Sequence, residues 1–140
     1  MTKVHVDTDV LLDVFLERDP FKWDSAGVFS LAEEGRIRIT LSALSLMNAH
    51  YTLQKNVGAD EAKRRVNLLL EMVDLLPVSE KHIRLALSVD FNDFEDAVQF
   101  MIAREEGMDF IVTRNIKDSR HSPIPVLTPS QFIASFASSR

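Results

Sequence analysis

The sequence has no cysteine among its 140 residues. Disulfide bonds and thiolate metal sites are therefore excluded, and the chain suits a reducing compartment. No apolar run approaches the roughly 18 residues that a membrane-spanning helix needs. The first apolar run stops at Asp7, which is too early for the core of a secretory signal. We therefore expect a cytoplasmic protein with no membrane partner.

Positive charge is also scarce, because 16 Lys and Arg stand against 21 Asp and Glu, for a net charge of −5. This balance argues against a broad basic surface for nucleic acid. It does not exclude a nuclease, since a carboxylate-rich site that holds cations makes a chain acidic. The hydrophobic share of 46% and the charged share of 26% are ordinary for a globular protein. Together with the length they predict a single domain, residues 1–140, with its own core.

Short apolar strands alternate with helical patterns along the whole chain. Strands are expected at residues 3–6, 36–40, 75–78, 109–113 and 124–127. Helical spacing is found at residues 10–17, 21–34, 42–56, 62–73, 79–88, 94–106 and from 129 onward. This alternation implies right-handed βαβ units. The predicted fold class is α/β, a three-layer α/β/α sandwich with a central, mostly parallel sheet of four to five short strands.

Three polar clusters fall at the ends of these predicted elements. They are residues 7–9 after the first strand, residues 93–96 at a helix start, and residues 113–115 after the 109–113 strand, with Asp118 nearby. In open parallel sheets the ligand site lies beyond the carboxyl ends of the strands. Hard cations such as Mg²⁺ and Mn²⁺ take oxygen ligands, so a metal site for phosphoryl chemistry can be assembled from the three clusters. The structural alternative is that Asp7 is a turn residue and that Asp96 only favours the helix dipole.

The same clusters carry a family resemblance. Residues 4–13, Val-His-Val-Asp-Thr-Asp-Val-Leu-Leu-Asp, resemble the opening of PIN domains. Residues 93–99 resemble the PIN segment with a central acidic ligand, and residues 111–118 resemble its closing Val-Thr-Arg-Asn/Asp-x-x-Asp motif. Order and spacing agree over nearly the whole chain. The sequence thus resembles the PIN-domain family, in particular its VapC-like toxin ribonucleases.

The resemblance implies a Mg²⁺- or Mn²⁺-dependent endoribonuclease that cleaves single-stranded or structured RNA. Such proteins are often the toxin half of a toxin–antitoxin pair, so a small antitoxin protein and a homodimer are the implied partners. The catalytic residues carried over are Asp7, Asp96, Asn115, Asn48 and Thr113. The metal ligands carried over are Asp7, Asp96, Asp118 and Asp93. Substrate contacts are expected from Thr8, Ser42 and Arg114.

Three positions depart from the usual family pattern. Asn48 and Asn115 stand where many PIN domains have acids, although one branch of the family shares the asparagine at position 48. An amide offers an oxygen without a charge, so we expect weaker metal affinity, with Asp93, Glu95 or Asp118 taking over part of the role. Asp9 replaces the usual asparagine and adds one carboxylate.

Two alternatives to a PIN nuclease follow from these residues. The first is a catalytically weak PIN-like module that binds RNA or a protein, which the two asparagines favour. The second is a phosphatase of the haloacid-dehalogenase type with Asp7 as nucleophile. It is disfavoured because the required downstream lysine has no clear candidate, and because Asn115 stands where that family needs an acid.

Other chemically active residues have simpler interpretations. The histidines show no ligand spacing and are interpreted as structural or surface residues. Arg114 is either a phosphate-binding fork or a surface arginine. Trp23 and the nine phenylalanines are expected in the core and not as base-stacking platforms. Met101 and Ile102 are expected on a buried helix face. Three basic residues are expected on a solvated helix face, with an RNA groove as the alternative: Lys55, Arg64 and Arg65.

Overall fold

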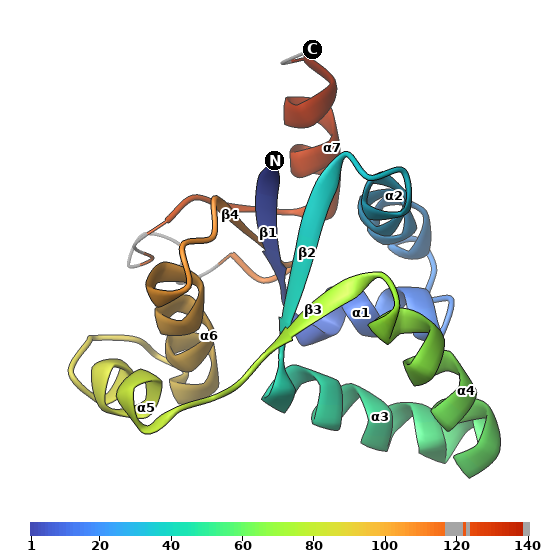
Figure 1. Ribbon diagram of the computed structural model, residues 1–140, viewed down its shortest axis with the longest axis horizontal. Coiled ribbons are helices and arrows are strands. Elements are labelled where there is room, and N and C mark those ends of the chain that lie inside the picture. The colour runs from blue at the N-terminus through green and yellow to red at the C-terminus, as the bar shows by residue number, and fades with distance from the viewer. Residues whose placement is uncertain (117–121, 123, 139–140) are drawn as a thin grey trace.

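A five-stranded parallel sheet forms the centre of the molecule. The computed structural model describes residues 1–116, 122 and 124–138. Its strand order is β3-β2-β1-β4-β5, and all four neighbouring pairs are parallel (Figure 1). The strands are β1 (Thr2–Val6), β2 (Ile37–Ser42), β3 (Val73–Leu76), β4 (Phe110–Val112) and β5 (Val126–Leu127).

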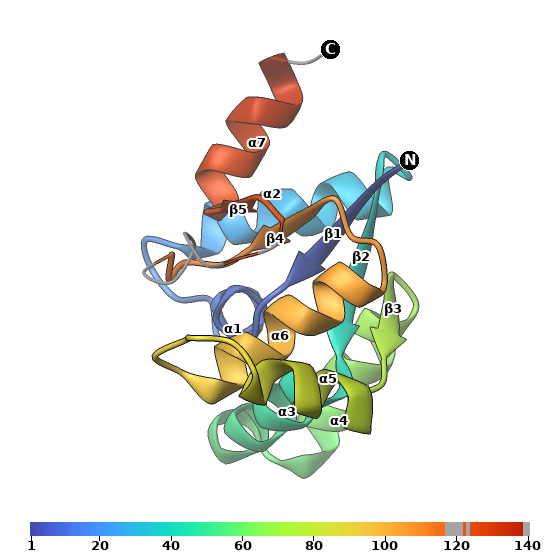
Figure 2. The same ribbon diagram turned by 90° about the vertical axis from the view of Figure 1, so that its left-hand side faces the viewer.

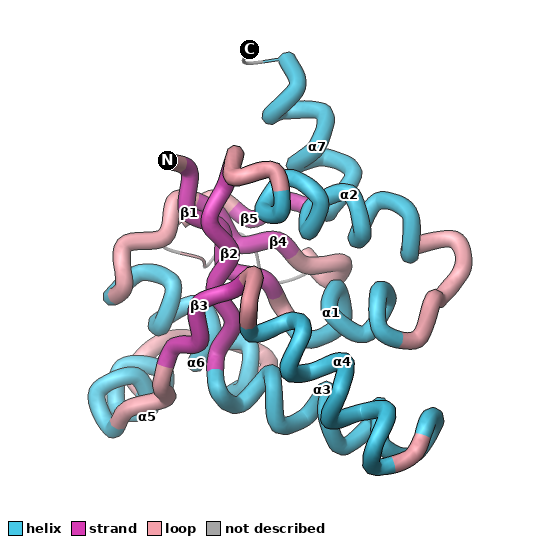
Figure 3. The backbone as a smooth tube through the Cα atoms, turned by 45° about the vertical axis from the view of Figure 1, so that its right-hand side comes forward, coloured by secondary structure: helices cyan, strands magenta, loops and turns pink. Residues whose placement is uncertain are grey.

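Helices cover both faces of this sheet. In Figure 1 the helices α1 to α4 lie on one side of the strands, and α5 and α6 lie on the other. Figure 3 shows the last helix, α7, beside α2. The three-layer α/β/α prediction is therefore confirmed. The helices are α1 (Thr8–Phe15), α2 (Lys22–Glu33), α3 (Ala43–Val57), α4 (Ala59–Leu70), α5 (Glu80–Leu87), α6 (Phe94–Glu105) and α7 (Pro129–Ser138).

The hydrophobic core is divided between the two faces. On one face, β1 and β2 pack with α1 to α4 and α7 through residues such as Val4, Leu11 and Phe132. On the other, α5 and α6 pack against β4 and β5 through residues such as Met101 and Ile111. In β1 and β2 apolar residues alternate with polar ones, and the polar His5 and Thr40 are buried with a hydrogen bond between them. Met101 and Ile102 are buried as expected.

The third strand differs from the sequence prediction. Val73 was expected to end a helix, but it begins β3, where it pairs with Ile39 of β2. The predicted strand was residues 75–78, yet β3 ends at Leu76. Pro77 follows directly and has no N–H to donate, so the strand stops there. Helical spacing of apolar residues had carried the predicted helix three residues too far.

Trp23 was expected in the core, and this prediction is wrong. Its side chain is 74% exposed, because α2 turns the opposite face, with Ser25 and Val28, toward the sheet. Two residues apart on a helix do not share a face. Phe21 and Phe94 are also more than one-third exposed. The other phenylalanines are buried or partly buried, as predicted.

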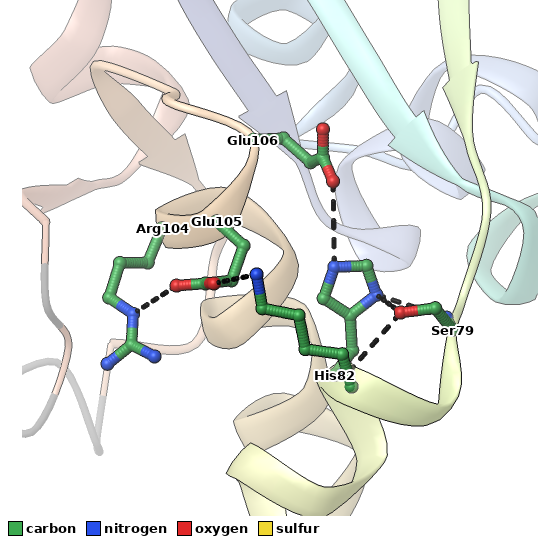
Figure 4. Close-up of polar contacts among 6 residues, drawn as sticks. Ser79, His82, Arg104, Glu105 and Glu106 are labelled. Atoms are coloured by element: carbon green, nitrogen blue, oxygen red, sulfur yellow. Dashed lines mark hydrogen bonds and ion pairs between the residues drawn. The ribbon is translucent and has the colours of Figure 1, made fainter.

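Polar contacts fasten α5 to α6, and Figure 4 shows them. The buried His82 closes a capping box at the start of α5, where its Nδ1 accepts from the Ser79 N–H at 3.1 Å. The other ring nitrogen lies 3.7 Å from a Glu106 carboxylate oxygen at the far end of α6. The Glu105 carboxylate forms ion pairs with both Lys81 and Arg104. His82 is therefore a structural residue, as expected; His121 lies outside the described residues.

Within the described residues, no helix combines the length and the apolar character needed to cross a membrane.

Candidate active site

Asp7 joins the carboxyl end of β1 to that of β4. It caps α1, and its Oδ1 accepts from the Thr8 N–H at 2.7 Å. Its Oδ2 accepts from the Thr113 hydroxyl at 3.0 Å, and its own N–H donates to the Val112 carbonyl at 3.0 Å. Asp7 and Thr113 follow neighbouring parallel strands in the sheet. Their convergence is the one expected beyond the carboxyl ends of such strands.

Asp9 brings a second carboxylate to the same threonine. Its Oδ2 accepts from the Arg114 N–H at 3.3 Å and lies 3.5 Å from Thr113 Oγ1. Its Oδ1 is buried and has no hydrogen-bond partner in the described part of the chain. Burial, followed by the charge of Asp7, raises the pKa of Asp9 to about 6. The two carboxylates therefore repel one another, and a cation between them would relieve that repulsion.

The first turn of α6 brings further acids to this edge. Asp93 caps the helix, with its Oδ1 accepting from the Asp96 N–H at 2.9 Å. Glu95 accepts from the Asn48 side-chain amide of α3 at 3.1 Å. Burial and then the charge of Asp7 raise the pKa of Glu95. The Glu95 carboxylate is therefore close enough to Asp7, at the end of β1, for the two charges to interact. Figure 2 shows α6 crossing the sheet with its first turn toward the end where α1 begins.

The same face of α6 holds a buried polar network below the acids. Gln99 lies one helical turn after Asp96, so both are on one face of the helix. Its carbonyl oxygen is 2.8 Å from His5 Nε2 in β1, and its amide donates to Ser42 Oγ at 2.9 Å. His5 Nδ1 is 2.8 Å from Thr40 Oγ1 in β2. This network fixes the α6 face that carries Asp96 against β1.

The network also assigns the His5 tautomer. Burial lowers the pKa of His5, which favours a neutral ring. The Gln99 carbonyl can only accept, so the ring proton lies on Nε2. Nδ1 then accepts from the Thr40 hydroxyl, whose other neighbour is the weak acceptor Met108 Sδ at 3.2 Å. His5 is therefore a structural residue, as expected, but no pattern in the sequence indicates that Gln99 is its partner.

Asp13 is a buried acid that sequence reasoning did not single out. Its side chain is fully buried in α1, and its Oδ2 accepts from Arg114 Nε at 2.8 Å and from Ser25 Oγ at 3.2 Å. The guanidinium carbon of Arg114 lies 4.1 Å from the centre of the Phe21 ring. Arg114 is thus a positioned cation and not an ordinary surface arginine. The sequence signal that could have identified Asp13 is the position of an acid within the otherwise apolar pattern of Val10–Phe15.

The remaining predicted site residues differ in accessibility. Ser42 is fully buried as the N-cap of α3, so its hydroxyl has no exposed surface for a substrate. Asn48 is exposed and holds Glu95, whereas Asn115 donates its main-chain N–H to Thr113 Oγ1 at 3.2 Å. Thr8 has a half-buried side chain next to Asp7. Asp118 lies outside the described residues.

The donor set fits a hard divalent cation with few protein ligands. Among the described residues, no group of three or more His, Asp or Glu side chains comes close enough to form a metal cage. Mg²⁺ commonly takes only one or two carboxylates and keeps several waters. Asp7 and Asp9, with the unpartnered Asp9 Oδ1, offer that minimal set.

Comparison with known proteins agrees with this fold. Ribonuclease VapC1 of Aquifex aeolicus is 25% identical over 136 residues, which cover 93% of this chain and 92% of that protein. Two solved structures share the fold at 16% identity. VapC20 of Mycobacterium tuberculosis, described as a Sarcin-Ricin loop cleaving toxin, has a TM-score of 0.65 with 84% of this chain and 93% of that chain covered. DNA-bound VapBC from Salmonella typhimurium has a TM-score of 0.68 with 92% and 99% covered.

The family model described as PIN domain matches residues 3–117, which include the carboxylates of β1 and α6 and the threonine after β4. The chain therefore belongs to the PIN-domain family.

Proposed function

We propose that this protein is a Mg²⁺- or Mn²⁺-dependent endoribonuclease that hydrolyses phosphodiester bonds of single-stranded or structured RNA. One observation carries the proposal. Asp7 and Asp9 converge on Thr113 at the carboxyl ends of β1 and β4, and one Asp9 oxygen is left unpartnered in the described structure. Similarity to a ribonuclease over 93% of the chain supports the same activity.

Asp7 and Asp9 would hold the cation, and Asp96 and Asp93 of the α6 start are proposed to act with them. A bound divalent ion would supply positive charge for the phosphate and lower the pKa of a water nucleophile. Thr113 keeps Asp7 in place through its hydroxyl at 3.0 Å. Asn48 orients Glu95, so it serves the site as a hydrogen-bond donor to an acid.

We also propose that the protein is the toxin of a toxin–antitoxin pair. An apolar groove of about 210 Å³ lies between α1, α2 and α4, and Arg65 is its one charged lining residue. Such a groove suits the apolar face of a partner helix. Solved structures of the same fold include toxin–antitoxin complexes. The apolar lining consists of Leu11, Val14, Phe15, Phe29, Leu68, Leu69 and Met72.

A homodimer is part of the same proposal. Met47 and Tyr51 are 71% and 64% exposed, and they lie one turn apart on α3. Phe94 at the start of α6 is also 48% exposed. Exposed apolar side chains of this size are characteristic of protein interfaces when they gather in one area. We place the protein in the cytoplasm, in keeping with its lack of cysteine.

Cleavage of a mixed RNA pool tests the nuclease directly. Wild type should cleave with Mg²⁺ or Mn²⁺ and lose activity in EDTA. Asp7→Asn should abolish cleavage and keep the fold, as seen by circular dichroism. Asp60→Asn, an exposed acid on α4, is the matched control and should cleave normally. Cleavage that survives both EDTA and Asp7→Asn would remove the proposal.

A catalytically weak PIN-like binding module is the second candidate. It is favoured by the absence of a three-ligand acidic cluster among the described residues and by the amides at positions 48 and 115. The same assay separates the two, because a binding module retains RNA without cutting it. The phosphatase alternative is set aside, since the PIN-domain match covers residues 3–117.

A further inference from the structure

A hollow in the protein surface lies directly beside the candidate active site around Asp7 and Asp9. It has a volume of about 330 Å³ and is lined by the starts of α2 and α7 together with Arg114. Arg114 follows Thr113 in the chain, and its N–H donates to Asp9 at 3.3 Å. Because Arg114 both lines the hollow and contacts Asp9, the hollow lies next to the carboxylates of the candidate site. Its volume lies at the small end of the range for ligand pockets, about 300–1,000 Å³, which suits one nucleotide.

The arginine in this hollow is held in a fixed position. Its Nε donates to the fully buried Asp13 at 2.8 Å, and its guanidinium lies over the Phe21 ring. In the described part of the chain, its two terminal nitrogens donate to no protein acceptor. An arginine fixed in this way can offer the rest of its fork to a phosphate at little entropic cost.

The other walls suit a nucleobase. Phe21 is 41% exposed and Pro129 adds a second apolar surface. Unpaired bases of RNA are bound by stacking on such aromatic and arginine surfaces. Asp24 also lines the hollow, and it has no ion-pair partner among the described residues. Its carboxylate provides two acceptor oxygens side by side.

We propose that this hollow binds a guanine nucleotide of the RNA next to the scissile phosphate. The base packs against Phe21, its phosphate meets Arg114, and the Asp24 carboxylate accepts from the N1–H and the N2 amine. Guanine is the only common base that presents two adjacent donors on that edge. This inference rests on the proposed ribonuclease function, because it names the nucleotide that such an enzyme selects.

Binding of mononucleotides to the full chain in EDTA tests the inference. The probes are 5′-GMP, AMP, CMP and UMP, and the readout is the change of backbone amide NMR signals on titration. GMP should bind more tightly than the other three. Phe21→Ala should weaken GMP binding by about tenfold through the lost stacking. Trp23→Ala removes an exposed aromatic of the same helix outside the hollow and should change nothing.

Two further variants sharpen the test. Asp24→Asn should abolish the preference for GMP and leave the four nucleotides bound alike. Asp7→Asn should still bind GMP, because no metal is needed, so loss of the nuclease proposal and loss of this one are distinguishable. Equal binding of the four nucleotides to wild type, or GMP binding that Phe21→Ala leaves unchanged, would overturn the inference.

Discussion

Asp9 differs in its chemistry from an ordinary surface acid. It is half-buried beside Asp7, and its pKa is raised to about 6 by burial and by that neighbouring charge. A carboxyl whose folded pKa exceeds its unfolded value binds more protons in the folded state. Without a bound cation, the protonated Asp9 carboxyl therefore stabilises the fold fully below about pH 4. This contribution to the free energy of unfolding is lost as the pH rises through 6.

The raised pKa of Asp9 gives a prediction for the stability of Asp9→Asn in EDTA. The wild type should lose stability relative to the variant between pH 4 and pH 7, by on the order of 2 kcal/mol. Urea unfolding of both proteins at pH 4.5 and 7.5 measures the difference. Asp60→Asn serves as the exposed control. A stability gap between Asp9→Asn and wild type that does not change with pH would show that burial and the charge of Asp7 do not raise the pKa of Asp9.

At the level of helices and strands, the arrangement of the elements that carry the candidate site was largely predictable. Polar residues directly after β1 and β4 had to meet, because parallel strands end at one edge of a sheet. The N-caps of helices could also be predicted, because Ser79, Thr128 and the acids at the start of α6 are residue types that favour this position. The hydrogen bonds from His5 to Gln99 and from Arg114 to Asp13 could not be predicted from the sequence. They join residues 94 and 101 positions apart, and apolar periodicity says nothing about which buried polar groups pair.

The Gln99 network makes α6 and β1 one unit, which Gln99→Met should disrupt. The methionine leaves the His5 Nε2–H without an acceptor, so the free energy of unfolding should fall by about 2 kcal/mol. RNA cleavage should fall as well, because the α6 turn with Asp96 loses its fixed position. Urea unfolding and the cleavage assay measure these effects. Gln54→Met on the exposed face of α3 is the control. Unchanged stability of Gln99→Met would mean that the network does not fasten α6.

The whole molecule combines an acidic charge with an apolar groove, so its partners should be recognised by shape and apolar contact more than by net charge. Leu68 is 50% exposed at the groove between α1, α2 and α4. Leu68→Asp should keep the fold and weaken binding of the proposed antitoxin by tenfold or more. The proposed antitoxin, to be sought among small proteins encoded beside this gene, is the titrant, and calorimetry measures its affinity.

Leu87→Asp is the control for that experiment, because Leu87 is 70% exposed on α5, away from the groove. Its affinity for the partner should equal that of wild type. If both leucine variants bind equally well, the groove is not the docking surface.

The most direct test of the molecule as a metal-dependent nuclease is a Mn²⁺ titration of the wild type and of Asp7→Asn, followed by electron paramagnetic resonance of the free ion. We expect saturable binding to the wild type that is lost in Asp7→Asn while both proteins remain folded. No binding to the wild type, or equal binding to both proteins, would contradict a cation site at the carboxyl ends of β1 and β4.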